Sequence, residues 1–156
     1  MKKFVLAAVA ATFAVPAAAA PGDTATDQGT ATATIIAPIS ILHDGGALDF
    51  GTLVSPTVSS TVTVVAGSPN VTGGDAVWLS GGSSDSFTVN GQVGRTFSII
   101  TTGGTMGGMS FTTDAPASGT ILSGGTVFSV DGELTIPGGQ AAGVYTGNYD
   151  ATVSYL

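Results

Sequence analysis

The sequence predicts an all-β protein, an immunoglobulin-like β-sandwich of short antiparallel strands, and three observations support this. Short runs rich in Thr, Val, Ile and Phe follow one another from Ala31 onward, separated by clusters of Gly, Ser, Asn and Asp. Apolar and polar residues alternate around Phe87/Val89 and Phe97/Ile99, as in strands with one buried side. No segment has a sustained helical period. An eight-stranded barrel is the alternative architecture.

The expected strands are the apolar runs between the turn clusters. They cover residues 31–37, 39–43, 48–53, 60–65, 75–79, 85–90, 95–101, 108–113, 126–130, 133–136 and 144–155. Period-two alternation in the last run predicts one common face, made of Tyr145, Gly147, Tyr149, Ala151, Val153 and Tyr155. Asp131-Gly132 lies between two apolar runs and is expected to be a two-residue hairpin turn, and Asn90-Gly91 has the same form.

Residues 1–19 have the pattern of a secretory signal peptide. Lys2 and Lys3 precede the apolar run Phe4–Val15, and small residues lead to an expected cleavage site after Ala19. The apolar run has about a dozen residues, whereas a membrane-spanning helix needs about twenty. We therefore expect an exported protein that passes through the periplasm to the cell surface or the medium, without a membrane span.

The exported chain is expected to contain one domain. Residues 20–30 carry no large apolar side chain and are interpreted as a flexible N-terminal arm. Residues 31–156 are long enough for one sandwich domain with its own core.

Charge and cysteine content exclude several functions. Removing Lys2 and Lys3 changes the formal net charge from −7 to −9 and leaves Arg95 as the only lysine or arginine. Because a phosphate backbone repels a protein this acidic, nucleic acid is not an expected partner. The chain has no cysteine, which excludes thiol catalysis, thiolate metal sites and disulfides.

The residues that would serve in catalysis have structural interpretations. His43 is the only histidine, and the run His43-Asp44-Gly45-Gly46 is typical of a strand that ends in a turn. Glycoside hydrolysis requires two paired acids, but nothing in the sequence brings two of the candidate acids together, and they are interpreted as turn and edge residues. These acids are Asp44, Asp49, Asp131 and Glu133. No enzymatic activity, metal or cofactor is therefore expected.

Two binding functions also have weak sequence support. No calcium-binding loop or nonapeptide repeat occurs in the chain. Trp78 and the three tyrosines are candidates for a platform that stacks on sugars, but a lone tryptophan in Ala76-Val77-Trp78-Leu79 is more typical of a core.

Three segments resemble a known family. They are Leu48-Asp49-Phe50-Gly51, Phe87-Thr88-Val89-Asn90-Gly91 and the C-terminal block from Gly138 to Tyr155, GGQAAGVYTGNYDATVSY. Together they resemble a bacterial family of exported proteins known as a domain of unknown function and related to spore coat U and to chaperone–usher pilus subunits. Pilus subunits end in an alternating strand, with an aromatic at the penultimate position and a glycine at the fourteenth from the end. Tyr155 and Gly143 occupy those positions.

The resemblance implies a pilin-like sandwich that lacks one strand. Its groove would be filled first by a periplasmic chaperone, with delivery to an usher, and then by the N-terminal arm of the next subunit. The assembly residues implied on the C-terminal strand are Gly143, Tyr145, Tyr149, Ala151, Val153 and Tyr155. Such head-to-tail contacts do not close and so produce fibres. The chain departs from many pilus subunits in having no disulfide and few large apolar residues in its arm.

The donor segment has two interpretations. Ala31, Ala33 and Ile35, or the opposite face Thr32, Thr34 and Ile36, would serve as the donated strand. The same residues would equally form the first strand of the sandwich itself, which is favoured because Pro38-Ile39-Ser40-Ile41 continues directly.

We therefore expect a structural or adhesive surface protein, a pilin-like or coat-like subunit that assembles by β-strand complementation. A self-contained secreted β-sandwich that binds surface glycans is the alternative. An outer-membrane barrel would need longer strands and aromatic girdles, and aromatic residues make up only 7% of the chain.

Overall fold

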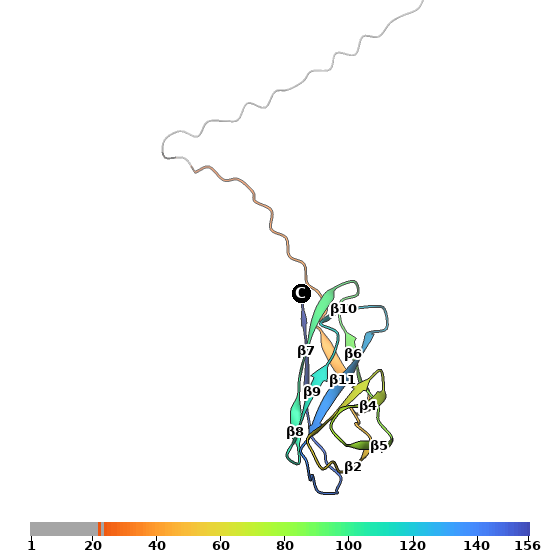
Figure 1. Ribbon diagram of the computed structural model, residues 1–156. Coiled ribbons are helices and arrows are strands. Elements are labelled where there is room, and N and C mark those ends of the chain that lie inside the picture. Colours follow the sequence, from red (N-terminus) through yellow and green to blue (C-terminus); the bar gives the residue numbers. More distant parts are fainter. Residues whose placement is uncertain (1–21, 23) are drawn as a thin grey trace, which may run out of the picture. The chain divides into compact units, whose positions relative to one another are not determined.

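The computed structural model describes residue 22 and residues 24–156 (Figure 1). The expected signal peptide, residues 1–19, and residues 20, 21 and 23 of the expected arm lie outside the described residues. The chain divides into two compact units, residues 1–34 and 35–156. In the first unit, residues 24–34 are exposed and contain no helix or strand. The strands of the described chain all belong to the second unit.

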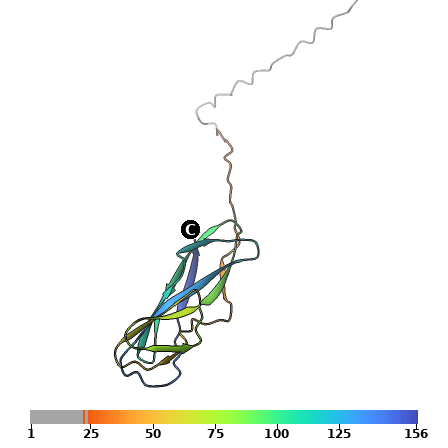
Figure 2. The same ribbon diagram turned by 45° about the vertical axis from the view of Figure 1, so that its right-hand side comes forward.

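The second unit is a sandwich of antiparallel sheets, which confirms the all-β prediction. The seven-stranded sheet contains β1 (Ser40–His43), β3 (Ser60–Val65), β4 (Ser68–Gly73), β6 (Asp85–Asn90), β8 (Gly104–Met106), β9 (Met109–Asp114) and β11 (Thr126–Ile136). The three-stranded sheet has the order β10 (Ser118–Thr120), β7 (Thr96–Thr102), β12 (Asp150–Tyr155). A two-stranded sheet joins β2 (Thr52–Val54) to β5 (Val77–Ser80). Strands β7 and β12 lie side by side in Figures 1 and 2.

Strand β11 organises the larger sheet. Its first half pairs with β6, and its second half pairs with both β3 and β9. Alternate side chains along β11 point into the core, from Phe128 to Ile136. Asp131-Gly132 lies in the middle of this continuous strand, so the predicted hairpin turn is wrong. A Cβ on Gly132 would come within 2.5 Å of the Thr112 carbonyl oxygen, so glycine is needed here for close approach of another strand.

The core has two halves. Between the two main sheets lies a cluster that contains Val89, Phe97, Ile99, Ile121, Phe128 and Val130, which we call the upper cluster. The other half, which we call the lower cluster, contains Phe50, Val62, Val64, Met109, Phe111, Leu134 and Ile136. No strand of the three-stranded sheet contributes to the buried side chains of the lower cluster. Leu48, Tyr145 and Tyr149, from irregular segments, pack against it instead.

The hairpin β3–β4 is absent from the sequence prediction. Its two-residue turn is Ala66-Gly67, with φ of 49° and 74°, the geometry of a type I′ turn. Asn-Gly or Asp-Gly is the usual sequence signal for such a turn, so Ala-Gly does not predict one. Pro69 also argues against a strand, but it is tolerated because β4 is an edge strand. Strands β8 and β10 are absent from the prediction because each has only three residues.

Three predicted strands are wrong in position or length. Residues 31–37 form no strand, and the Ile35 side chain is 93% exposed, so this run is not the first strand of the sandwich. The predicted strand 144–155 is shortened to Asp150–Tyr155, because residues 138–149 pack as irregular chain over the lower cluster. The predicted strand 48–53 begins only at Thr52.

Two smaller predictions are also corrected. Asn90-Gly91 is not a hairpin turn, because β6 and β7 belong to different sheets and the chain crosses between them here. Trp78 is 41% exposed and lies outside the core, since every residue of β5 is exposed in the two-stranded sheet.

Replacing Ala66 by glycine should stabilise the protein by about 0.5–1 kcal/mol, because the left-handed conformation strains a residue with a Cβ. The Ala66 N–H, which donates to the Asp131 carboxylate at 3.2 Å, is retained in this variant. Chemical denaturation measures the free energy of unfolding. Ala142→Gly, at an exposed position without a positive φ, is the matched control and should lower it. A loss of stability in both variants would contradict the assignment of strain to Ala66.

Candidate functional site

One edge of strand β12 has no partner among the described residues. β12 pairs only with β7, and the Leu156 N–H continues this ladder by donating to the Thr96 carbonyl at 3.2 Å. Hydrogen-bonded and non-hydrogen-bonded pairs alternate along an antiparallel ladder. Thr152 and Ser154 therefore bond to β7 through their backbones. The residues whose N–H and C=O groups face the open edge are Ala151, Val153 and Tyr155.

Strand β1 also has an open edge within the described chain. It pairs only with β6, and the Asp44 N–H extends the ladder by donating to the Ser86 carbonyl at 3.1 Å. By the same alternation, Leu42 bonds to β6, while the backbones of Ile41 and His43 face away from it.

The two open edges lie next to each other over the same apolar side chains. Ile39 and Ile41 pack against the upper cluster, and so do Ala151, Val153 and Tyr155. At their closest, Cα atoms of β1 and β12 lie within 8 Å, yet the two strands are not paired. We call this junction the β1–β12 seam.

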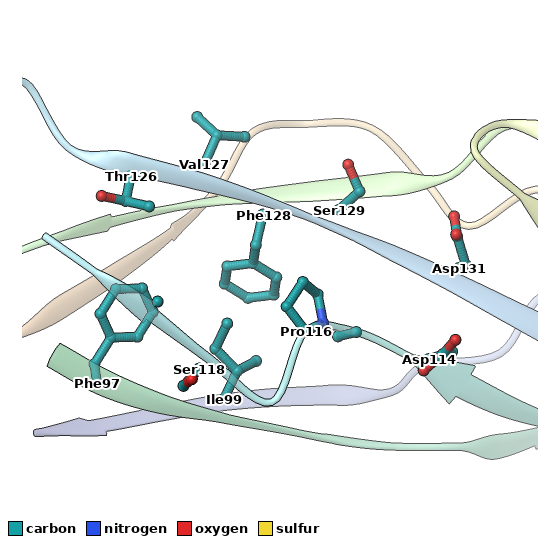
Figure 3. A pocket seen from close by; sticks show the side chains of 12 residues that line it. Phe97, Ile99, Asp114, Pro116, Ser118, Thr126, Val127, Phe128, Ser129 and Asp131 are labelled. Atoms are coloured by element: carbon teal, nitrogen blue, oxygen red, sulfur yellow. The ribbon is translucent and has the colours of Figure 1, made fainter. Parts of the chain in front are cut away.

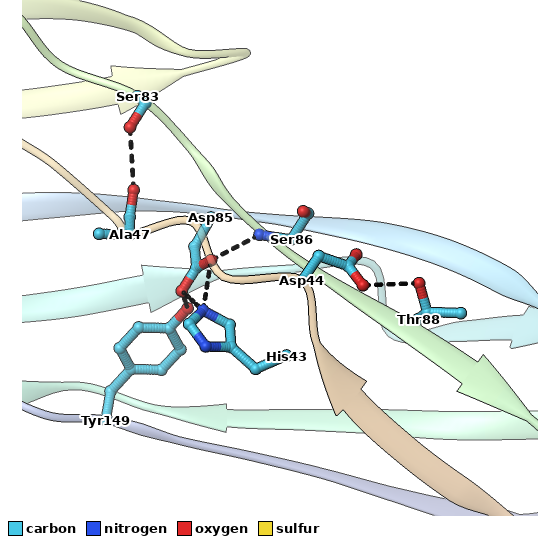
Figure 4. A network of polar contacts seen from close by, with 8 residues as sticks. All are labelled: His43, Asp44, Ala47, Ser83, Asp85, Ser86, Thr88 and Tyr149. Carbon is cyan, nitrogen blue, oxygen red and sulfur yellow. Dashed lines mark hydrogen bonds and ion pairs between the residues drawn. The ribbon is translucent and has the colours of Figure 1, made fainter.

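At one end of the seam, the buried carboxylate of Asp85 connects His43 to Tyr149 (Figure 4). His43 Nε2 lies 2.8 and 3.0 Å from the two carboxylate oxygens of Asp85, and the Tyr149 hydroxyl donates to Asp85 Oδ2 at 2.6 Å. The Ser86 N–H donates to Oδ1 at 2.7 Å. The Asp85 side chain is only 4% exposed, so these donors replace the water that it loses on folding.

The environment of Tyr149 changes its acidity. Burial of the ring, followed by the hydrogen bond to Asp85 and the charge of that carboxylate, raises the pKa of the Tyr149 hydroxyl well above its usual range. The hydroxyl therefore stays protonated and remains a donor to Asp85. Asp85 is not among the site residues predicted from the sequence. Its only signal there is an acid at an inward position in the alternation that includes Phe87 and Val89.

At the other end of the seam, a second tyrosine, Tyr155, makes the connection. The Tyr155 hydroxyl donates to the Ala37 carbonyl at 2.8 Å and accepts a hydrogen bond from the Gln92 N–H at 2.7 Å. A Cβ on Gly91 would come within 2.4 Å of this hydroxyl, so only glycine leaves room for it.

The other predicted assembly residues lie away from the seam. Gly143 is exposed, and Tyr145 packs against the lower cluster while its hydroxyl donates to the Ala141 carbonyl at 2.7 Å. The predicted set is thus divided between β12 and the irregular chain before it. The predicted donor residues Ala31, Ala33 and Ile35 are exposed and lie in no strand.

Two hollows open into the sandwich. The larger, about 1040 Å³, is lined by residues 46–56, which include β2, and by the irregular segment 140–149, together with His43, Asp85 and Phe111. The smaller, about 610 Å³, lies beside β11, where Phe128 points toward Phe97 and Ile99 of β7, and Asp114 and Asp131 lie near one end (Figure 3).

The acids singled out in the sequence hold turns and loops. Asp44 accepts a hydrogen bond from the Thr88 hydroxyl at 2.8 Å. Asp49 accepts the N–H groups of Gly51 at 2.8 Å and Gly82 at 3.3 Å, which fastens the Leu48-Asp49-Phe50-Gly51 motif to the turn after β5. Asp131 accepts the Ser84 hydroxyl, and Glu133 is exposed on β11. Among residues 24–156, no three His, Asp or Glu side chains are placed to hold a metal ion.

No helix within the described part of the chain is long and apolar enough to cross a membrane.

An alkaline titration followed by tyrosinate absorbance should show one tyrosine that ionises above the usual range, and Tyr149→Phe should remove that step. Because the pKa of Tyr149 is raised in the folded state, its contribution to stability is full below about pH 10 and is lost as the pH rises above that value. Tyr145→Phe is the matched control and should leave the step in place. A step that persists in Tyr149→Phe would show that the burial of this hydroxyl is wrongly assigned.

Comparison with known families shows the family of this chain. The family model described as "Domain of unknown function (DUF4402)" matches residues 39–155, which include every strand of the sandwich. No curated protein and no solved structure matches the chain. Because the match covers most of the sequence, the chain belongs to the DUF4402 family.

Proposed function

We propose that this protein is a structural subunit of the bacterial surface, pilin-like or coat-like, that assembles by addition of a β-strand. The observation that supports the proposal is the β1–β12 seam, where two unpaired edges meet over one apolar cluster. Unpaired edges readily template pairing with another chain, and proteins normally cover or block them. The edge of β12 carries no proline, no lysine and no bulge that would block such pairing.

The chemistry of β12 suits an added strand. Ala151, Val153 and Tyr155 combine side chains packed on the core with backbone groups that face the open edge. An incoming strand would bond to those groups and place alternate side chains over the upper cluster. Insertion between β1 and β12 requires about twice the strand spacing of 4.8 Å, so the seam has to widen from its closest approach.

The segment that includes Ala31, Ala33 and Ile35 is the proposed donor. It is exposed and has no strand partner in the described chain. It consists of small and β-branched residues, and β-branched residues favour strands. Donation to a second copy is a head-to-tail contact, which propagates into a fibre. Before assembly the same edge needs a temporary cover, and a periplasmic chaperone that delivers the subunit to an usher would supply it. The spacing of Gly143 and Tyr155, shared with pilus subunits, also supports this proposal.

The alternative, a secreted glycan-binding module, rests on the larger hollow. Its volume of about 1040 Å³ and the presence of Tyr145, Tyr149 and His43 along its walls are compatible with a sugar-sized ligand. This function predicts a monomer that keeps its ligand binding when the edge of β12 is blocked.

Replacing Ala151 by proline should abolish self-assembly and leave the fold intact. The Ala151 N–H faces the open edge, so proline removes no bond to β7 but prevents a strand from pairing. Light scattering of the mature chain from Ala20 should show oligomers for the wild type and monomers for the variant. Thr152→Pro, which removes a bond to β7, is the control and should unfold the protein more easily. A wild type that stays monomeric, or Ala151→Pro oligomers, would overturn the proposal.

Paired variants identify the donor face. Ala33→Asp/Ile35→Asp and Thr34→Asp/Ile36→Asp introduce the same charges on opposite faces of the donor segment. One pair should prevent oligomers because its side chains enter the groove, and the other should be tolerated because its side chains face solvent. If neither pair changes the mass measured by light scattering, this segment is not the donor.

A further inference from the structure

The two tyrosine contacts at the ends of the β1–β12 seam share one antiparallel register. Tyr155 reaches Ala37 directly, and Tyr149 reaches His43 through the Asp85 carboxylate. The chain direction is opposite on the two sides, and the same number of residues separates the contacts on each strand.

This register sets two apolar pairs opposite each other between the contacts. Counting inward from the two contacts, the register places Ile41 opposite Ala151 and Ile39 opposite Val153, and all four side chains pack against the upper cluster. Ile41 and Ala151 each present backbone groups to the seam, as the ladders to β6 and β7 require. No backbone hydrogen bond joins these two strands in the described structure. Side-chain packing and the two tyrosine contacts are therefore what holds the seam together.

We propose that the β1–β12 seam is a latch, held closed by the hydroxyls of Tyr149 and Tyr155, whose release exposes the edge of β12. The role of the latch in assembly rests on the proposed function, since an open seam is the state that accepts an added strand. The existence of the latch does not rest on it.

The contacts are suited to reversible opening. A net hydrogen bond between neutral groups changes an equilibrium by about two- to tenfold, and one to a charged group by about ten- to a hundredfold. The two side-chain bonds therefore leave the seam with fewer bonds to break than a backbone ladder of several bonds would. Release of Tyr149 leaves the Asp85 carboxylate with His43 and the Ser86 N–H as partners. Release of the Ala37 carbonyl leaves the Tyr155 hydroxyl with the Gln92 N–H. Opening therefore leaves no buried charge without a partner. A buried charge without a partner is the usual barrier to breaking such networks.

The absence of cysteine allows a direct measurement of opening. A single Val153→Cys substitution places a half-buried thiol at the centre of the seam with little change in volume. The rate of its reaction with a soluble disulfide reagent, in the native protein, reports how often the seam opens. In this background we expect Tyr155→Phe, which loses a bond to a neutral carbonyl, to raise the rate by about two- to tenfold. Tyr149→Phe loses a bond to a carboxylate and should raise the rate by about ten- to a hundredfold.

Tyr145→Phe is the matched control, because its hydroxyl bonds within segment 141–145 and touches neither strand of the seam. It should leave the labelling rate unchanged. Denaturation curves of each variant separate opening of the seam from global unfolding, since global unfolding would raise labelling in proportion to lost stability. Equal rates in all variants, or an equal rise with Tyr145→Phe, would overturn the latch.

The proposed function fails separately from the latch. If Tyr149→Phe and Tyr155→Phe raise labelling and also speed the formation of oligomers in light scattering, both proposals hold. If labelling rises while every form stays monomeric, the latch stands and strand addition is wrong.

Discussion

The edge of β12 is the constraint on which the rest of the structure depends. A strand that packs apolar side chains inward while its backbone lacks a second partner presents N–H and C=O groups that water, a covering element or another strand has to satisfy. In this protein the neighbour is β1, which has the same unsatisfied edge and the same apolar contacts. No hydrogen-bond ladder joins β1 to β12, and side-chain contacts hold the two strands next to each other instead. The proposed assembly and the proposed latch both depend on that one unformed ladder.

The remainder of the fold holds this edge in place from the opposite side. β11 runs through the larger sheet and joins β6, which carries both β1 and the Asp85 carboxylate, to β3 and β9 around the lower cluster. The Leu48-Asp49-Phe50-Gly51 motif fixes the chain after β1 by placing Phe50 in that cluster. The irregular segment before β12 then packs Tyr145 and Tyr149 over the same cluster, which positions Tyr149 at the end of the seam.

Local patterns predicted the strands whose alternation is local, as in β3, β6, β7 and β9. They failed where a distant contact decides the outcome. Asp-Gly at Asp131 reads as a turn, but the close approach of Thr112 makes Gly132 a strand residue. Burial of Asp85 depends on donors from His43 and Tyr149, which are remote in sequence, so no local signal marks it as part of the site. Tyr155 and the inward residues of β12 were predictable because period-two alternation defines them.

Amide hydrogen exchange along β12, measured residue by residue by NMR on the monomeric mature protein, tests the central claim most directly. The amides of Thr152, Ser154 and Leu156 bond to β7 and should exchange slowly. Those of Ala151, Val153 and Tyr155 face the open edge and should exchange much faster, in strict alternation. Equal protection of all these amides would show that the edge of β12 is already paired, and would contradict the account of an unfilled strand position.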